Sequence, residues 1–250
     1  MKHVERFEVR FYEADRASRL TPVSLFNYLQ ETAIRHSDTA GMDGDSLMRR
    51  GYAWMLNRLH MRILRYPLRR EVVQVETWGS CLRGLFAVRE WRATDARGEV
   101  VALATGRWLV IDLKRKKIVK ILPDMQAAYG EYEDRAMIDT FERMDPIQGG
   151  TNPRRFHVRS SELDINQHAN SASYVDWCLE AVPGDILEGY LPFGIEITFK
   201  KEAKLGEELV ATSLEVPGAG PGERRFHHLL SRSTDGAVNA IAASVWRPVT

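Results

Sequence analysis

Apolar positions recur at helical spacing in two separate stretches of the chain. The first begins at Thr21-Pro22, a typical N-cap followed by a first helical residue, and Gly41 ends it. Its apolar stripe consists of Leu25, Phe26, Leu29, Ala33 and Ile34. The second stretch follows Asn170 and ends at Pro183-Gly184, and its stripe consists of Tyr174, Val175, Cys178, Leu179 and Val182. The sequence therefore predicts one helix over 22–40 and another over about 171–182.

Each predicted helix is followed by a series of strand-like segments, in which apolar residues alternate with polar ones. In the first half these segments lie near 52–65, 71–80, 84–94 and 99–112. In the second half they lie near 193–203, 207–216, 223–233 and 237–247. The order strand, helix, then several strands occurs twice, which predicts an α+β protein with an internal repeat.

The repeat is also visible residue by residue. The segment 102–108 aligns with 240–246 at an offset of 138 residues, since 246 − 108 = 138, and both segments end in tryptophan. The same offset places Gly98 on Gly236, so two predicted hairpin turns coincide. One face of each segment carries only small residues, which predicts a close approach between sheet and helix. These residues are Ala102, Ala104 and Gly106, and Ala240, Ala242 and Ser244.

An antiparallel sheet wrapped around one long helix, present twice, resembles a tandem hot-dog fold. We therefore expect an N-terminal domain over 1–123 and a C-terminal domain over 153–250. The polar, glycine-containing segment 124–152 would connect them across the surface, with a short helix over 123–132.

Composition places the chain among ordinary globular proteins. It has 250 residues, of which 44% are hydrophobic and 28% charged, and a net charge of +1, so nothing at whole-chain level indicates nucleic-acid binding. The N-terminus is charged at once and no apolar run reaches membrane-spanning length, which predicts a cytoplasmic protein without stable membrane insertion. Cys81 and Cys178 lack metal-type spacing and are expected to be free thiols in packed surroundings.

The run Asp164-Ile165-Asn166-Gln167-His168 places three reactive side-chain types at every second residue, just before the second helix. In extended backbone, Asp164, Asn166 and His168 would share one face. A carboxylate, a carboxamide and an imidazole together can activate water, hold a polarised oxygen and move a proton, as hydrolysis of an activated acyl group requires. A polar loop that only caps the following helix explains the same residues, because Asp and Asn are common in turns and caps.

Several ordered motifs make nearly the whole chain similar to the acyl-acyl-carrier-protein (acyl-ACP) thioesterases of plant plastids and bacteria. In the first half they are Tyr12-Glu13, Asp15-Arg16, the segments 29–33 and 58–60, and Glu76-Thr77-Trp78. In the second half they are the segment 164–170, Tyr174, Trp177, Leu179-Glu180 and the segment 196–202. Plant members have Cys after the residue matched by Glu202, whereas this chain has Ala203, so a cysteine nucleophile at that position is excluded.

The resemblance implies that Asp164 acts as general base or direct nucleophile. Asn166 and His168 would position or polarise the thioester, and Glu202 would orient the water or tune its neighbours. The helix beginning near Asn170 could add backbone N–H groups for the oxyanion. A thioester carbonyl is already electrophilic, so no metal or other cofactor is expected.

Other side chains have structural interpretations beside functional ones. The resemblance implies that the first half encloses the fatty chain, with core packing as the alternative for each wall candidate: Phe26, Leu29, Ile34, Trp54 and Met55. Asn170 is expected to be an N-cap. His60 is expected to be a hydrogen-bonded strand residue, Cys178 to serve packing, and His227-His228 to form an exposed strand pair without ligand partners.

The implied partner is an acidic acyl carrier protein, which requires a positive surface near the entrance of the site. The basic candidates are Arg49-Arg50, Arg65, Arg69-Arg70, Lys114-Arg115-Lys116-Lys117, Arg154-Arg155, and Lys200-Lys201 with Lys204. A solvated face is the alternative for each cluster. Pairing of two chains into a homodimer is a further expectation. The alternative functions are a hot-dog acyl-CoA thioesterase, which would use the same residues, a non-catalytic acyl-binding or regulatory protein, and, less favoured, a hot-dog dehydratase.

Overall fold

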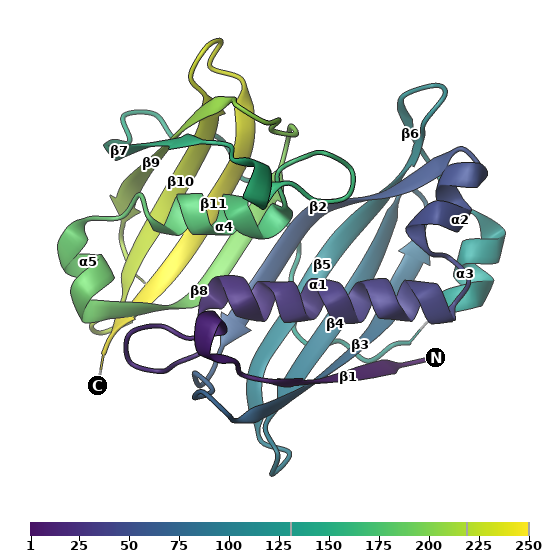
Figure 1. Ribbon diagram of the computed structural model, residues 1–250, viewed down its shortest axis with the longest axis horizontal. Coiled ribbons are helices and arrows are strands. Elements are labelled where there is room, and N and C mark those ends of the chain that lie inside the picture. The colour runs from purple at the N-terminus through teal and green to yellow at the C-terminus, as the bar shows by residue number, and fades with distance from the viewer. Residues whose placement is uncertain (131, 219, 250) are drawn as a thin grey trace. The chain divides into compact units, whose positions relative to one another are not determined.

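The computed structural model describes residues 1–130, 132–218 and 220–249 (Figure 1). The chain forms two compact units, Met1–Thr140 (unit 1) and Phe141–Thr250 (unit 2). The domain limits at 123 and 153 stay a prediction; by packing, residues 124–140 group with unit 1. Among the described residues, no helix combines the length and the apolar character needed to span a membrane.

Unit 1 is an antiparallel sheet with one long helix across one face (Figure 1). Its strand order is β1-β3-β4-β5-β2, with β6 paired to β5. The strands are β1 (His3–Glu8), β2 (Tyr52–Ile63), β3 (Val72–Arg83), β4 (Phe86–Thr94), β5 (Val100–Asp112) and β6 (Lys117–Val119). The helices are the 3-10 turn η1 (Phe11–Glu13), α1 (Pro22–Thr39), α2 (Gly44–Arg49) and α3 (Pro123–Tyr129).

Unit 2 repeats this topology with the strand order β8-β11-β10-β9-β7 and a shorter central helix. The strands are β7 (Thr151–His157), β8 (Tyr190–Phe199), β9 (Glu208–Val216), β10 (Arg224–Arg232) and β11 (Val238–Pro248). The helices are the 3-10 turn η2 (Ser160–Glu162), α4 (Ser171–Leu179) and α5 (Gly184–Gly189). The predicted α+β tandem hot-dog fold is confirmed, because each sheet has one central helix across it and the two orders match strand for strand.

Helix α1 forms where the sequence predicts it. The Thr21 hydroxyl accepts a hydrogen bond from the Ser24 backbone N–H at 3.2 Å, and Pro22 occupies the first turn. Leu25, Phe26 and Leu29 are at most 1% exposed. Burial of each such side chain stabilises the unit by about 1.5–3 kcal/mol.

The small residues on one face of β5 leave room for a tryptophan side chain, which links the sheet to α1. A Cβ atom on Gly106 would lie 3.0 Å from the Trp91 ring, so any other residue there would push the ring aside by a few tenths of an ångström. The Trp91 indole N–H in turn donates to the Leu29 carbonyl of α1 at 2.8 Å. The indole therefore fills the space between β5 and α1.

Two segments differ from the expectation. The short helix predicted over 123–132 is present as α3, but its Met125 and Tyr129 are buried in the core of unit 1, so this part of the connection does not lie on the surface; residue 131 lies outside the described residues. The second helix ends at Leu179 rather than near 182, and Pro183 caps α5 instead of starting a loop. Proline satisfies both roles, because it stops one helix and suits the start of the next.

Candidate functional site

The segment 163–169 of unit 2, which we call the Asp164 loop, is a tight turn rather than the extended run that the sequence analysis expected. The Asp164 N–H donates to the His168 carbonyl at 2.8 Å, and Gln167 adopts a positive φ of 63°. One carboxylate oxygen, Asp164 Oδ1, accepts the backbone N–H of Asn166 at 2.8 Å and that of His168 at 3.3 Å. An aspartate side chain commonly stabilises a turn in this way, because it accepts hydrogen bonds from nearby backbone N–H groups that would otherwise pair with another strand.

Both ends of the Asp164 loop are fixed to the fold. Leu163 and Ala169 form an isolated β-bridge, and the Ala169 N–H donates to the Ala203 carbonyl at 2.9 Å. Asn170 is the N-cap of α4, as predicted, because its Oδ1 accepts the Ala172 N–H at 2.9 Å. The Asn170 carbonyl accepts the Ser173 N–H. Two early N–H groups of α4 are therefore already bonded, which leaves fewer donors for an oxyanion than the sequence analysis assumed.

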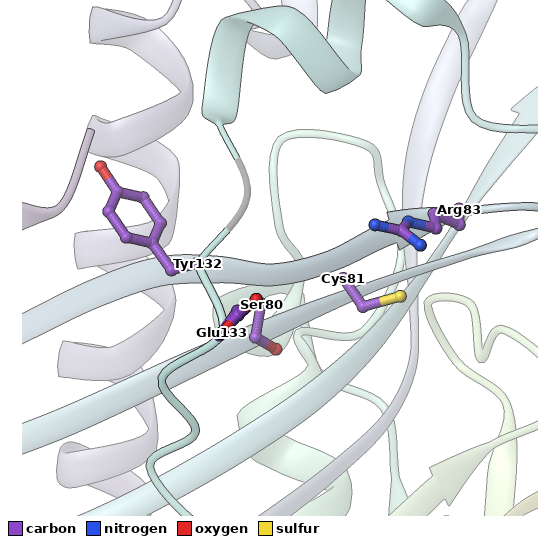
Figure 2. Close-up of a pocket in the computed structure, with 5 residues that line it drawn as sticks. All are labelled: Ser80, Cys81, Arg83, Tyr132 and Glu133. Atoms are coloured by element: carbon purple, nitrogen blue, oxygen red, sulfur yellow. The ribbon is translucent and has the colours of Figure 1, made fainter.

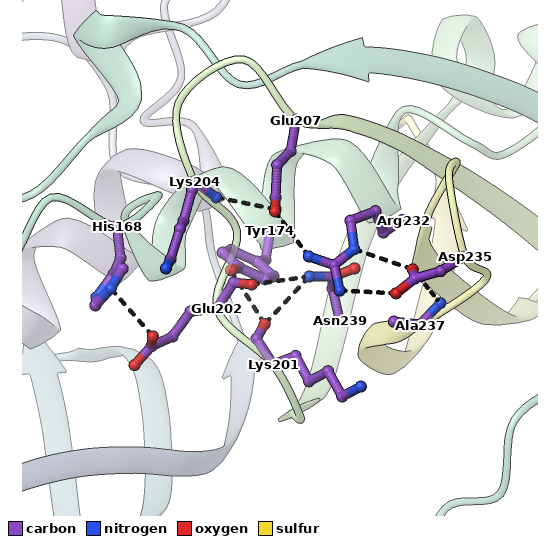
Figure 3. A network of polar contacts seen from close by, with 10 residues as sticks. All are labelled: His168, Tyr174, Lys201, Glu202, Lys204, Glu207, Arg232, Asp235, Ala237 and Asn239. Atoms are coloured by element: carbon purple, nitrogen blue, oxygen red, sulfur yellow. Dashed lines mark hydrogen bonds and ion pairs between the residues drawn. The ribbon is translucent and has the colours of Figure 1, made fainter.

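The bond between Ala169 and Ala203 brings the chain after β8 beside the Asp164 loop. As a result, His168 Nε2 lies 3.0 Å from Glu202 Oε2 (Figure 3). The two side chains are 30% and 63% exposed, so their contact is accessible to a substrate. Asp164 is half-buried and Asn166 is exposed at the turn. The structure thus places the four predicted catalytic residues in one loop and the adjoining strand end.

A carboxylate with a spare oxygen next to a carboxylate-bound imidazole can take a proton from water and pass it on. Asp164 uses only Oδ1 for the turn, and Oδ2 accepts no hydrogen bond from the part of the chain that the structure describes. A carboxylate at this distance can hold the orientation of an imidazole ring, the role that a third group plays in hydrolytic triads. The arrangement is therefore suited to hydrolysis of an acyl group.

Two residues near this site escaped the sequence analysis or were given only a packing role. Tyr174 of α4 donates its hydroxyl to the Lys201 carbonyl at 3.3 Å, and Asn239 of β11 donates its side-chain amide to the carbonyls of Lys201 and Glu202 (Figure 3). Burial raises the pKa of Tyr174 well above its usual value, with the nearby carboxylates of Glu202, Glu207 and Asp164 adding to the shift, so the phenol remains a donor. Asn239 could have been found by aligning the two repeats, as argued below.

Unit 1 contains the same loop with different reactive side chains. In the segment 14–20, the Asp15 loop, Asp15 Oδ1 accepts the backbone N–H of Ala17 at 2.8 Å and of Arg19 at 2.9 Å. Ser18 has a positive φ of 62°, as Gln167 has in unit 2. Arg19 Nε also bonds Asp15 Oδ2 at 3.0 Å, so both carboxylate oxygens are occupied.

The predicted acyl-wall residues do not form one surface. Phe26 and Leu29 are buried on the inner face of α1, and Trp54 packs against the core cluster that contains Tyr129. Ile34 is 54% exposed and cannot line an enclosed wall of unit 1. Met55 follows Trp54 in β2 and therefore lies on the opposite face of the sheet. The acyl-binding role of Phe26, Leu29 and Trp54 stays a prediction.

Unit 1 also has a pocket of about 340 Å³ between β3 and the segment after α3 (Figure 2). Its lining residues are Ser80, Cys81, Arg83, Tyr132 and Glu133, none of which was a wall candidate. Cys81 is a free, half-buried thiol, and Cys178 is free and buried. Burial raises the pKa of the Cys178 thiol to about 12, which agrees with a packing role.

Two histidines outside the Asp164 loop, His60 and His228, have structural partners. His60 Nδ1 lies 2.8 Å from Asp139 Oδ2, as expected for a hydrogen-bonded strand residue. The prediction of an exposed His227-His228 pair is wrong for His228, which is 0% exposed and bonded to the Ser244 hydroxyl at 2.7 Å. Its strand position faces the core because strand side chains alternate between faces.

Comparison with known proteins gives consistent results for both halves of the chain. Residues 1–129 match the model of the acyl-ACP thioesterase N-terminal domain, and residues 148–248 match that of the acyl-ACP thioesterase C-terminal domain.

Curated relatives come from plants. The chain is 27% identical over 281 residues to oleoyl-acyl carrier protein thioesterase 1, chloroplastic, of Arabidopsis thaliana, covering 99% of this chain and 76% of the relative. It is 31% identical over 267 residues to a chloroplastic acyl-[acyl-carrier-protein] hydrolase of Cuphea viscosissima, covering 98% of this chain and 62% of the relative. Among solved structures, the 12:0-ACP thioesterase from Umbellularia californica has a TM-score of 0.88 at 22% identity, covering 99% of this chain and 94% of that chain.

Proposed function

Because the chain belongs to the acyl-ACP thioesterase family, we propose that it hydrolyses the thioester of a fatty acyl-acyl carrier protein, releasing free fatty acid and the carrier and so ending chain elongation. The observation that carries this proposal is the open second oxygen of Asp164 in the same turn as His168, whose imidazole pairs with Glu202. The cytoplasmic location stays a prediction, since both curated relatives described above are chloroplastic.

In the proposed reaction, water attacks the thioester carbonyl carbon while Asp164 Oδ2 takes a proton from it. Asp164 Oδ1 meanwhile keeps its two backbone hydrogen bonds, so the turn holds the carboxylate, and with it Oδ2, in place. The C–S bond then breaks, and the proton returns to the departing sulfur. Direct attack by Asp164 to give an acyl-aspartate, followed by its hydrolysis, uses the same residues.

The proposed partner is an acidic carrier protein that docks on lysines beside the site. Lys200, Lys201 and Lys204 are exposed and flank Glu202 on both sides in the sequence. At the equivalent positions, unit 1 has Leu64, Arg65 and Leu68. Complementary charge at the rim of a site mainly accelerates and orients association. Two of the three positive charges are therefore specific to the unit that carries the Asp164 loop, whereas Arg65 keeps the charge of Lys201 in unit 1.

The test is the release of free fatty acid and carrier thiol from acyl-ACP and from acyl-CoA with the same acyl chains. We expect hydrolysis that favours the carrier protein. Faster turnover of acyl-CoA would replace the carrier assignment by an acyl-CoA thioesterase. Saturable acyl binding without hydrolysis by the folded protein would contradict the proposal and favour an acyl-binding protein.

A further inference from the structure

The chain segment that carries Glu202 is held by two polar side chains that unit 1 lacks. Asn239 Nδ2 donates to the Lys201 carbonyl at 3.3 Å and to the Glu202 carbonyl at 3.2 Å (Figure 3). The Tyr174 hydroxyl donates to the same Lys201 carbonyl. Both carbonyl oxygens can only accept hydrogen bonds, so the Asn239 side chain must present its NH2 group to them. This requirement fixes the orientation of the amide.

The internal repeat shows that the fold does not need asparagine at this position. In unit 2 the Asn239 carbonyl accepts the N–H groups of Lys200 at 2.9 Å and Lys201 at 3.2 Å. In unit 1 the Val101 carbonyl accepts those of Leu64 at 2.8 Å and Arg65 at 3.2 Å. The backbone junction is therefore the same in both units, and a buried valine supports it in unit 1.

The stability of the fold does not by itself favour asparagine at position 239. It is 1% exposed, and its Oδ1 has no hydrogen-bond partner among the residues that the structure describes. An unsatisfied buried polar atom costs free energy that a valine avoids. The position equivalent to Tyr174 is Leu25, by the 149-residue offset that relates Asp15 to Asp164, so both tethering side chains are polar only in unit 2.

We propose that Asn239, with Tyr174, is a positioning residue, which fixes the strand end so that the Glu202 carboxylate meets the His168 imidazole. This inference rests on the proposed function and takes Glu202 as the group that orients His168. The Asn239 side chain is buried and, among the described residues, donates only to backbone carbonyls, so it acts through the segment that carries Glu202. A site held within a fraction of an ångström needs such support, because small displacements of reacting groups slow catalysis strongly.

The test is Asn239→Val, which installs the residue that unit 1 uses at the same junction. We expect kcat for the acyl-ACP to fall roughly 10- to 100-fold with KM within about 2-fold, the size typical for loss of a supporting hydrogen bond. The thermal midpoint should be unchanged or higher. Tyr174→Phe, which removes a single hydroxyl, should act in the same direction and serves if the valine variant does not fold.

A double-mutant cycle separates positioning from a general loss of structure. In a Glu202→Gln background, Asn239→Val should change kcat by less than about 3-fold, because coupled residues are non-additive. The matched control is Ser213→Ala, which also removes a buried hydrogen bond to a carbonyl, that of Ala181 at 2.7 Å, but away from the strand end. This control should lower the thermal midpoint and leave kcat unchanged. Wild-type kcat in Asn239→Val, or an undiminished effect in the Glu202→Gln background, would overturn the inference.

A second measurement does not depend on turnover. Nitrogen NMR of the His168 imidazole should show the same change of signal in Asn239→Val as in Glu202→Gln. If His168 responds to both substitutions although no acyl thioester is hydrolysed, the positioning inference stands and the proposed function fails. If His168 responds to Glu202→Gln alone, the inference fails and the proposed function is unaffected.

Discussion

The Asp15 loop and the Asp164 loop have the same backbone and opposite chemical character. Each is preceded by a 3-10 turn with an arginine and a glutamate, Arg10 and Glu13 in unit 1 and Arg159 and Glu162 in unit 2. Each aspartate accepts two backbone N–H groups through Oδ1. These shared contacts build the turn in both units.

The difference lies in the fifth residue of the turn. Arg19 closes over Asp15 and occupies Oδ2, whereas His168 turns to Glu202 and leaves Asp164 Oδ2 open. The position of Glu202 is taken by Tyr66 in unit 1, which is buried and whose pKa burial raises well above the usual value. A structural turn therefore becomes a candidate reactive site when its carboxylate has no cationic partner and the same turn carries an imidazole paired with a second carboxylate.

The largest difference between the two loops is expected when one carboxylate is removed at a time. Asparagine keeps an oxygen for the two backbone N–H groups but cannot act as a base. We expect Asp164→Asn to lower kcat roughly 1,000-fold, within the range of general base catalysis. Asp15→Asn should leave kcat near the wild-type value, and steady-state assays of both variants check the difference. Equal loss in the two variants would show that Asp164 matters only for the turn.

The second test exchanges the residues that distinguish the loops. In His168→Arg, the new guanidinium should bind Asp164 Oδ2 as Arg19 binds Asp15, and kcat should fall roughly 100-fold or more because the base is paired and the imidazole is lost. The thermal midpoint should be retained. Arg19→His is the reciprocal control and should not change kcat. Activity that survives His168→Arg would contradict the roles proposed for this loop.

The third prediction compares the buried histidines of the two units. Burial lowers the pKa of His228 to about 3, with His227 adding to the shift, and burial beside Arg89 lowers that of His36 to about 3. The folded pKa lies below the unfolded value of about 6.5, so neither group affects stability above pH 6.5. As the pH falls from 6.5 toward 3, these two histidines become protonated in the unfolded chain but stay neutral in the folded chain, so the free energy of unfolding decreases.

For His228 this loss amounts to about 2 kcal/mol at pH 5. Urea unfolding at pH 7 and pH 5 should therefore show a smaller loss in His228→Gln than in the wild type. His157→Gln is the exposed counterpart for comparison, because this side chain is 69% exposed. A pH dependence identical in wild type and His228→Gln would exclude His228 as a source of acid sensitivity.

The smallest expected effect concerns docking. Reversing the charges of Lys200, Lys201 and Lys204 to glutamate should raise KM for acyl-ACP roughly 10-fold and leave that for a small acyl thioester almost unchanged. The increase should shrink at high salt. The matched control reverses three exposed lysines of unit 1: Lys114, Lys116 and Lys117. If the control raises KM as much, docking does not distinguish the two units.

The sequence by itself determined the two helices, eight of the strands within a few residues, and the duplication, because apolar spacing and turn residues act locally. It also identified Asp164, Asn166, His168 and Glu202 as candidates, although the extended conformation expected for them was wrong. Strands β1, β6 and β7 and the short helices α2 and α5 carry weaker periodic signals and were left out or only implied.

Which of these residues meet depends on contacts between segments that lie far apart in the sequence. Glu202 reaches His168 because Ala169 bonds Ala203 across the fold, a contact between segments that no local pattern encodes. The same contact geometry in unit 1 joins Leu20 to Pro67, where the side chains differ and Arg19 closes the loop. The backbone junction is thus common to both units, and the few polar side chains placed around it decide which unit carries the candidate site.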